Sequence, residues 1–211
     1  RGLGGSSAIN AMVYIRGQKQ DFDDWQAAAG PGWGWDAVLS AYKAIEHNEA
    51  GANAWRGQGG PLYVSNNRRG LHWLEDYIAA CTEAGLPYNA DFNGESQEGA
   101  GTYQMTIKGR RRNSAARAFL RPAMRRPNLA VITGAQVTRV MLDGTRATGV
   151  EYLQDGQRRT LRASAEVILC GGAINTPQLL QLSGIGPGGL LQGMGIPVVA
   201  DNVNVGSHMS D

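Results

Sequence analysis

In the N-terminal part of the chain, apolar residues recur mainly at the spacing of amphipathic helices. The pattern predicts a helix that begins at Asp21–Trp25 and ends at Gly30-Pro31-Gly32, and a second helix over residues 37–45. A third helix is predicted over residues 72–84. Ser114 stands in the N-cap position of a fourth helix, because its hydroxyl can accept a hydrogen bond from a free amide in the first turn.

In the C-terminal part, the pattern changes to alternation and to short continuous apolar runs, which are typical of strands. Asp143-Gly144 and Asp155-Gly156 predict tight hairpin turns between successive runs. The run at 166–170 is typical of a buried strand, and it leads through Gly171-Gly172 into a further helix. The expected strands along the whole chain are residues 62–64, 102–108, 129–133, 136–142, 147–153, 158–162 and 166–170.

Two segments are less regular. Residues 8–15 fit either a helix or a strand, and residues 46–61, which are rich in Gly, Asn and Ala, predict an exposed loop. The order of elements is helices, then a strand-rich region, then a strand–glycine–helix unit. This order predicts an α/β (mixed α+β) enzyme rather than a repeat protein or a helical bundle.

Composition narrows the function classes. A chain of 211 residues can bury one sizeable core or parts of two domains. Its net charge of +2 argues against a nucleic-acid partner, and the basic run Arg110–Arg112 fits a solvated surface. Two cysteines form neither a disulfide framework nor a metal site, which predicts reduced thiols and a cytoplasmic location. No apolar run approaches the ~18 residues of a transmembrane segment, and peripheral association with the inner face of the membrane stays open.

Two glycine-containing blocks carry the candidate chemistry. The first reads RGLGGSSAINAM over residues 1–12, and its glycines and small serines allow the backbone to approach a bulky polyanion closely. The second, residues 172–186, places backbone amides and a helix N-terminus together, which suits a phosphate or a ribose edge. A tight turn without any ligand is the alternative for the second block. The sequence contains no G-x-G-x-x-G unit, so this chain alone is not expected to form a complete dinucleotide-binding fold.

Together and in this order, the two blocks resemble the two signatures of the glucose–methanol–choline (GMC) flavoprotein oxidoreductases. The resemblance is closest to the bacterial choline and aliphatic-alcohol dehydrogenase branch, and it covers nearly the whole chain. It implies that the chain is an internal segment of a longer enzyme. Residues 206–209 also resemble an expression-tag scar, but Gly206 and Asp211 keep the family spacing, which favours a native segment. Further segments similar to the family are Tyr14–Gly17, Asp21–Trp25, Asp91–Gly94, Gln97–Gly99, Arg112–Leu120 and Asn204–Asp211.

The resemblance implies an FAD site. It places the Gly-Gly-Ser-Ser loop along the FAD pyrophosphate, the following segment against the isoalloxazine ring, and Val137 against the adenine. Some family members attach the flavin through a histidine at the position of Ile9, so FAD is expected to be non-covalent here. The residues assigned to the cofactor are Gly4, Gly5, Ser6, Asn10, Ala11, Met12, Val13 and Val137.

The resemblance also implies a domain organisation. Residues 1–66 are expected to form the FAD-binding loop and a covering segment, residues 67–127 part of a substrate-binding domain, and residues 128–211 a strand-rich return to an incomplete, Rossmann-like FAD-binding domain. The catalytic histidine of the family is expected beyond Asp211. Within the chain, none of the three histidines is expected to be catalytic: His47 is assigned to the surface, His72 to a structural role, and His208 to a place that the family does not use for catalysis. The scattered tryptophans are expected to pack in the core or in loops.

The implied function is oxidation of a primary alcohol, either choline or an aliphatic alcohol, to an aldehyde by hydride transfer to FAD. Two alternatives stay open: a GMC-type oxidase that uses oxygen, and a non-catalytic ligand-binding or scaffold segment. The sequence assigns neither the alcohol nor the electron acceptor.

Overall fold

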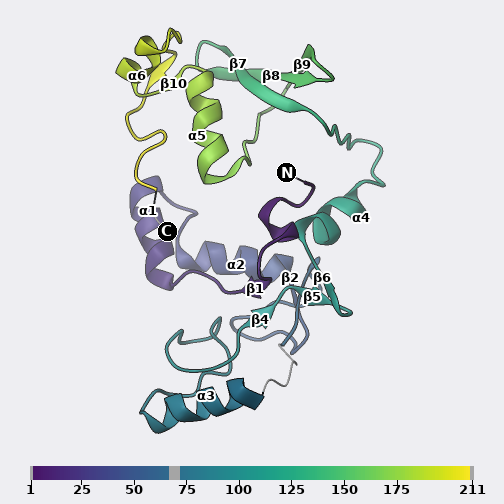
Figure 1. The fold of residues 1–211 in the computed structure, drawn as a ribbon, viewed down its shortest axis with the longest axis vertical. Helices are drawn as coiled ribbons and strands as arrows, with labels where there is room; N and C mark the ends of the chain where they lie inside the picture. The colour runs from purple at the N-terminus through teal and green to yellow at the C-terminus, as the bar shows by residue number, and fades with distance from the viewer. Residues whose placement is uncertain (1, 67–71, 210–211) are drawn as a thin grey trace. The chain divides into compact units, whose positions relative to one another are not determined.

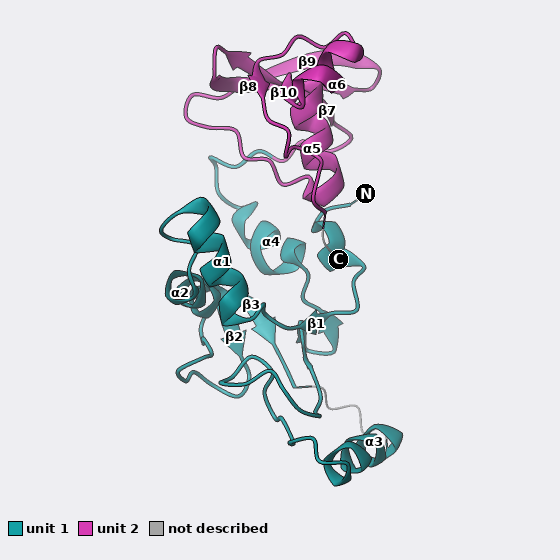
Figure 2. Ribbon diagram, turned by 90° about the vertical axis from the view of Figure 1, so that its left-hand side faces the viewer, with its two compact units in different colours: residues 1–130 teal, residues 131–211 magenta. Residues whose placement is uncertain are grey.

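The structure is a computed structural model that describes residues 2–66 and 72–209. The chain forms two compact units, Arg1–Ala130 and Val131–Asp211, which are coloured separately in Figure 2. The assignment of residues 1–66, 67–127 and 128–211 to flavin-side and substrate-side domains stays a prediction.

The longer helices of unit 1 occur where the periodicity predicts them (Figure 1). The first begins earlier than expected because Gln18 and Asp21 form a capping box, in which the Gln18 amide donates to Asp21 Oδ2 at 2.7 Å. It ends at Gly30, whose φ of 96° favours glycine. These helices are α1 (Lys19–Ala29), α2 (Trp35–Ile45) and α3 (His72–Glu83), and the shorter turns are η1 (Gly5–Ala8), η2 (Ala116–Leu120) and α4 (Arg121–Ala123).

Unit 1 has only short strand pairs among its described residues. The expected strand 102–108 is divided at Thr106, whose amide donates to Met12 O at 2.8 Å while its carbonyl accepts from the Asn113 amide at 2.8 Å. The pairs are β1 (Val13–Tyr14) with β4 (Gln104–Met105), β2 (Glu46–Asn48) with β3 (Leu62–Val64), and β5 (Ile107–Lys108) with β6 (Arg111–Arg112). Residues 8–15, which fit helix or strand, contain the last residue of η1 and the short strand β1.

A buried ion pair lies at the centre of unit 1. Arg16 Nη2 donates to Glu46 Oε2 at 2.6 Å, and both side chains are 1% exposed. The same carboxylate accepts the Gly57 amide at 2.9 Å, and its Oε1 accepts Asn48 Nδ2 at 2.9 Å. The expectation that residues 46–61 form an exposed loop is therefore wrong for its first part, because Glu46 turns this polar segment inward around the arginine.

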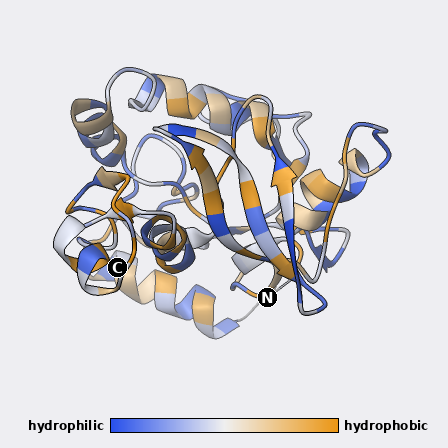
Figure 3. Cartoon of the chain, turned by 90° about the horizontal axis from the view of Figure 1, so that it is seen from above, coloured by the Kyte–Doolittle hydropathy of each residue, from blue (hydrophilic) through white to orange (hydrophobic). Residues whose placement is uncertain are grey.

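Unit 2 contains a three-stranded antiparallel sheet and the second glycine block. The hairpin turns predicted at Asp143-Gly144 and Asp155-Gly156 are both confirmed. Figure 3 shows that each strand of this sheet carries both apolar and polar residues. Helix α5 (Gly172–Leu182) packs on the first strand, where the Val140 amide donates to Ser183 Oγ at 2.9 Å. The remaining elements are β7 (Gln136–Asp143), β8 (Arg146–Gln154), β9 (Gln157–Arg162), β10 (Ile185–Gly186), α6 (Gly188–Gly193) and β11 (Ala200–Asp201), with β10 and β11 parallel.

Two of the expected strands are not strands. Residues 129–133 and 166–170 pair with no strand of the described part of the chain, and Ile168 is 74% exposed. An apolar run becomes a strand only when a neighbour accepts and donates its backbone hydrogen bonds, and neither run has such a neighbour here. The mixed helix-and-strand class predicted from the sequence is confirmed. None of the helices in residues 2–66 and 72–209 has the length and apolar character that crossing a membrane requires.

The Arg16–Glu46 pair yields a first prediction. Glu46→Ala leaves the buried Arg16 guanidinium without its counter-charge and the Gly57 amide without its acceptor, so unfolding should become easier by about 3–5 kcal/mol. Lys19→Ala is the control, since it breaks the solvent-exposed pair of Lys19 with Asp23 and should leave stability nearly unchanged. Urea unfolding followed by tryptophan fluorescence measures both, and equal effects would contradict a central role for the buried pair.

Candidate functional site

The first glycine block forms a tight turn at the start of unit 1, here called the glycine loop (residues 4–13). Gly4 and Gly5 have φ angles of 95° and 56°, in the left-handed region that favours glycine. The 3-10 turn η1 follows directly, and the Ser6 carbonyl accepts the amides of Ile9 at 3.0 Å and Asn10 at 2.8 Å. The glycines therefore reverse the chain direction so that the residues after them form a compact turn.

One side of the glycine loop packs on the helical segment 115–123 (Figure 1). A Cβ at Gly4 would lie 3.2 Å from the Ala116 Cβ, so the absence of a side chain permits this close contact. Ser7 Oγ accepts the Ala115 amide at 2.9 Å and donates to the Gly4 carbonyl. Ser114 directly precedes this helical segment, as predicted, and its carbonyl accepts the amides of Arg117 at 2.9 Å and Ala118 at 2.8 Å. Its hydroxyl accepts no hydrogen bond from the first turn within the described residues, and Ser7, which lies far away in the sequence, accepts the Ala115 amide instead.

The other side of the loop is open. A Cβ at Gly5 would meet no heavy atom within 4 Å, and the exposed Ser6 side chain makes no hydrogen bond within the described residues. Ile9 is 86% exposed. Gly5 and Ser6, both predicted to bind cofactor, are thus on the accessible side, while Gly4 and Ser7 hold the loop to the protein.

The second half of the loop is fixed by a network around Asn10. Its Oδ1 accepts the Met12 amide at 3.1 Å and Arg112 Nη1 at 2.8 Å, and its carbonyl accepts the same Nη1 at 2.7 Å. Met12 has a φ of 66°, which is uncommon for a residue with a side chain and is found often at functional sites. Ala11 is exposed, and Val13 is 40% exposed and pairs with Met105. The structure therefore brings seven of the predicted cofactor residues together in one segment.

A cavity of about 550 Å³ adjoins the glycine loop. Three arginines line it, Arg112, Arg117 and Arg121, and none of the described residues that line it is acidic. A cavity with several guanidinium groups and apolar walls suits an anionic ligand that also has an apolar part. Its lining residues are Leu3, Ala8, Arg112, Ser114, Ala116, Arg117, Leu120, Arg121 and Met124.

The remaining predicted contact, Val137, belongs to unit 2. It lies in β7 opposite Tyr152 and is 40% exposed. In the second glycine block of the same unit, Gly172 has a φ of 83°, and the Gly171 amide donates to Thr176 Oγ1 at 3.0 Å. That bond is internal to the turn, and whether the turn also binds a ligand stays open. A common site formed by Val137 and the glycine loop stays a prediction.

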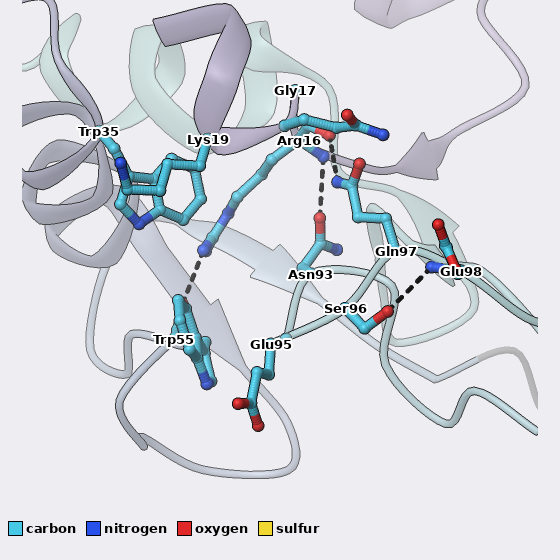
Figure 4. A pocket seen from close by; sticks show the side chains of 12 residues that line it. Arg16, Gly17, Lys19, Trp35, Trp55, Asn93, Glu95, Ser96, Gln97 and Glu98 are labelled. Carbon is cyan, nitrogen blue, oxygen red and sulfur yellow. Dashed lines mark hydrogen bonds between the residues drawn. The ribbon is translucent and has the colours of Figure 1, made fainter. Parts of the chain in front are cut away.

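A second cavity of unit 1, of about 320 Å³, was not predicted from the sequence (Figure 4). Trp35 and Trp55 line one side of it, with ring centroids 6.4 Å apart, and Glu95 and Glu98 lie along the loop that forms another side. Asn93 fixes this loop, because its Oδ1 accepts the Arg16 amide at 2.8 Å. The sequence predicts packing roles for the tryptophans. Trp35 and Trp55 pack on each other, whereas Trp73 on α3 is 65% exposed, so the prediction is wrong for Trp73. Folding also brings Trp35 and Trp55 to a cavity.

Two further titratable side chains of unit 1, Tyr14 and His47, are not among the residues that line these cavities. Burial raises the pKa of the Tyr14 hydroxyl above its usual value, which keeps that side chain neutral. His47 stacks on Tyr63 with ring centroids 5.0 Å apart, and its Nδ1 accepts the Gly59 amide at 3.1 Å. No histidine is among the described residues that line either cavity.

Sequence reasoning missed Ser7 and Arg112 as residues that shape the loop. The sequence predicts a solvated surface for Arg110, Arg111 and Arg112 alike. In the structure, Arg110 and Arg111 are exposed, whereas Arg112, on strand β6 of the β5–β6 hairpin, is partly buried. Strand geometry was the available signal, because neighbouring residues of a strand point to opposite faces.

Comparison with known proteins gives consistent similarities. Residues 1–208 match the family model described as GMC oxidoreductase. The chain is 44% identical over 209 residues to oxygen-dependent choline dehydrogenase of Brucella anthropi, and 44% identical over 208 residues to mitochondrial choline dehydrogenase of Mus musculus. Each alignment covers 99% of this chain but only 38% and 35% of the respective relative, so the chain spans little more than a third of their length.

Solved structures agree with these relatives. Pyridoxine 4-oxidase from Mesorbium loti superposes with a TM-score of 0.87 at 35% identity, covering 93% of this chain and 39% of that protein. A FAD-dependent oxidoreductase from Chaetomium thermophilum gives a TM-score of 0.86 at 34% identity, covering 93% of this chain and 36% of that protein. FAD is the stated cofactor of the Chaetomium protein, and a similar formate oxidase from Aspergillus oryzae, with a TM-score of 0.83 at 26% identity, also contains FAD.

Proposed function

The chain belongs to the GMC oxidoreductase family, and we propose that it is the flavin-side segment of an enzyme that oxidises choline or another primary alcohol to an aldehyde. The observation that carries this proposal is the 44% identity over 99% of the chain to curated relatives from a bacterium and from mouse, both named choline dehydrogenases. The proposal includes a small alcohol as substrate, a cytoplasmic location and no nucleic-acid partner. The electron acceptor stays unassigned.

The residues of the glycine loop fit an FAD diphosphate. Gly5 leaves open space where a side chain would otherwise stand, and the hydroxyl of Ser6 is available as a donor. The adjoining cavity supplies Arg112, Arg117 and Arg121 as positive charge. Bound flavin supplies the hydride acceptor for alcohol oxidation, and the residues of this chain would bind and orient it. The proton acceptor is proposed to lie outside this chain, as the family resemblance implies.

A second candidate is an oxidase that passes the electrons to oxygen. The similarity to pyridoxine 4-oxidase, with a TM-score of 0.87, favours this reading of the same site. Both candidates share the flavin site and the hydride transfer, and they differ only in how the reduced flavin is reoxidised.

Anaerobic flavin reduction tests the proposed function. The complete polypeptide that carries these residues, purified with FAD, should lose its visible flavin absorbance when choline or a medium-chain primary alcohol is added, because hydride transfer reduces the ring. Tetramethylammonium, which has the cationic head of choline without its hydroxyl, is the control and should cause no bleaching. An absorbance that persists with both alcohols would contradict the function and favour a scaffold role. Rapid return of colour in air, compared with an added dye, then separates oxidase from dehydrogenase.

Non-covalent attachment is a second expectation at this site. Ile9 occupies the position where some family members carry the attaching histidine, and its side chain offers no nucleophilic nitrogen. Acid precipitation of the purified flavoprotein should therefore release all of the yellow colour into the supernatant. Colour that stays in the washed pellet would contradict this expectation.

Gly5 provides the sharpest test of the glycine loop. Gly5→Val should abolish flavin incorporation, because the branched side chain would fill the open space beside the loop. Gly144→Val is a matched control: both glycines have a φ of 56°, and a Cβ at either meets no heavy atom within 4 Å. The backbone strain of about 1–2 kcal/mol is thus common to both variants. Flavin per protein, measured by absorbance, should fall only for Gly5→Val, and parallel losses would mean that strain alone is responsible.

A further inference from the structure

We infer that Arg112 is a positioning residue for the flavin: it holds the glycine loop in the shape that receives the cofactor. The inference rests on the proposed function and goes beyond it, because it assigns a role to a residue outside the loop. Arg112 lies about a hundred residues away in the sequence, on β6, and it reaches the loop through one side-chain nitrogen.

The contact is a clasp rather than a single bond. Arg112 Nη1 donates to Asn10 O at 2.7 Å, to Asn10 Oδ1 at 2.8 Å and, at a longer 3.3 Å, to Ser7 O. One guanidinium nitrogen thereby joins both ends of the turn from Ser7 to Asn10. Hydrogen bonds from a charged donor are stronger than those between neutral groups, and the planar guanidinium fixes the direction of the N–H groups on Nη1.

The clasp controls the backbone of the residue that follows. Asn10 Oδ1, oriented by Arg112, also accepts the Met12 amide at 3.1 Å. Met12 has a φ of 66°, a conformation that a residue with a side chain keeps only when its surroundings impose it. On its other side, Met12 O accepts the Thr106 amide at 2.8 Å. Without Arg112, Asn10 loses its orienting partner and Met12 can relax toward ordinary backbone angles.

Arg112 is not held by another charge. No Asp or Glu within residues 2–66 and 72–209 forms an ion pair with it, and its Nε and Nη2 donate no hydrogen bond there. Arg112 also lines the cavity of about 550 Å³ that adjoins the glycine loop. The backbone carbonyl of Arg112 accepts Arg117 Nη1 at 3.2 Å, which links the clasp to the helical segment beneath the loop. The charge of Arg112 is therefore committed to the loop and to the cavity beside it.

The neighbouring Arg111 offers a matched control. The hairpin pairs Lys108 with Arg111 and Ile107 with Arg112, and adjacent residues of a strand point to opposite faces. Arg111 is exposed and makes no side-chain hydrogen bond in the described part of the chain. Arg111→Ala and Arg112→Ala thus remove the same charge from the same strand, and only the second removes the clasp.

The experiment compares these variants in the complete polypeptide that carries these residues. FAD affinity is measured by fluorescence titration of the apoprotein, and backbone amide exchange of a peptide spanning residues 7–14 is measured without FAD. Arg112→Ala should weaken FAD binding about 10- to 100-fold and speed exchange in that peptide, as expected for loss of charge-assisted hydrogen bonds. Arg111→Ala should match the unaltered protein in both. Arg112→Lys should fall between them, since lysine keeps the charge but not the planar fork, and it replaces the alanine variant if that variant does not fold.

Each outcome decides the inference. Equal FAD loss in both alanine variants would overturn it, because bulk charge would be responsible. Weaker binding by Arg112→Ala without faster exchange would also overturn it, since Arg112 would then act by direct contact rather than by shaping the loop. Faster exchange with unchanged FAD affinity would remove the link to the cofactor. If the unaltered protein binds no FAD, the proposed function itself fails, and this inference fails with it.

Discussion

The buried pair of Arg16 and Glu46 is the constraint on which the first unit depends. A guanidinium removed from water is tolerable only when its charge is matched, and this requirement draws in several parts of the chain. Nη1 and Nη2 of Arg16 both donate hydrogen bonds, whereas its buried Nε has no acceptor among the described residues. Glu46 provides the counter-charge, Trp55 accepts Nη1 at 2.6 Å through its carbonyl, and Asn93 accepts the Arg16 amide. Segments of little apolar content thereby become core. Because Arg16 follows β1 closely, the same pair anchors the end of the glycine loop to the body of the unit.

The glycine loop shows how one short motif serves two purposes. Neighbouring residues of the same type have different tasks: Gly4 contacts Ala116 and Gly5 faces open space, while Ser7 bonds to Ala115 and Ser6 is free of such bonds among the described residues. A sequence motif does not distinguish these tasks, because each pair is chemically identical before folding. The loop can present an accessible face only because its other face is fixed to the helical segment.

What the sequence predicts well is local. Helices α1, α2 and α3 and the hairpins of the β7–β9 sheet follow from periodicity, caps and turn residues, which act within a few positions. What it predicts wrongly depends on distant partners. Residues 129–133 and 166–170 have the apolar content of strands but no neighbour to pair with in the described part of the chain. Residues 46–61 have the composition of an exposed loop, but the ion pair with Arg16 buries Glu46. The oxygen of Ser7 at Ala115 belongs to the same class, since no local pattern points to it.

The site has the same division between local and distant information. The resemblance to a known family locates the loop, because family motifs are contiguous, yet it says nothing of what gives the loop its shape. That shape comes from contacts across the fold: Thr106 holds the Met12 carbonyl, and Arg112 holds Asn10. Neither residue would be chosen from composition, and a run of three arginines even argues for a solvated surface. Strand geometry resolves the run, since it turns Arg111 to one face and Arg112 to the other. The face that Arg112 occupies is the one where its charge meets three oxygen atoms of the loop, so the hairpin contributes to the cofactor site by orienting a single side chain.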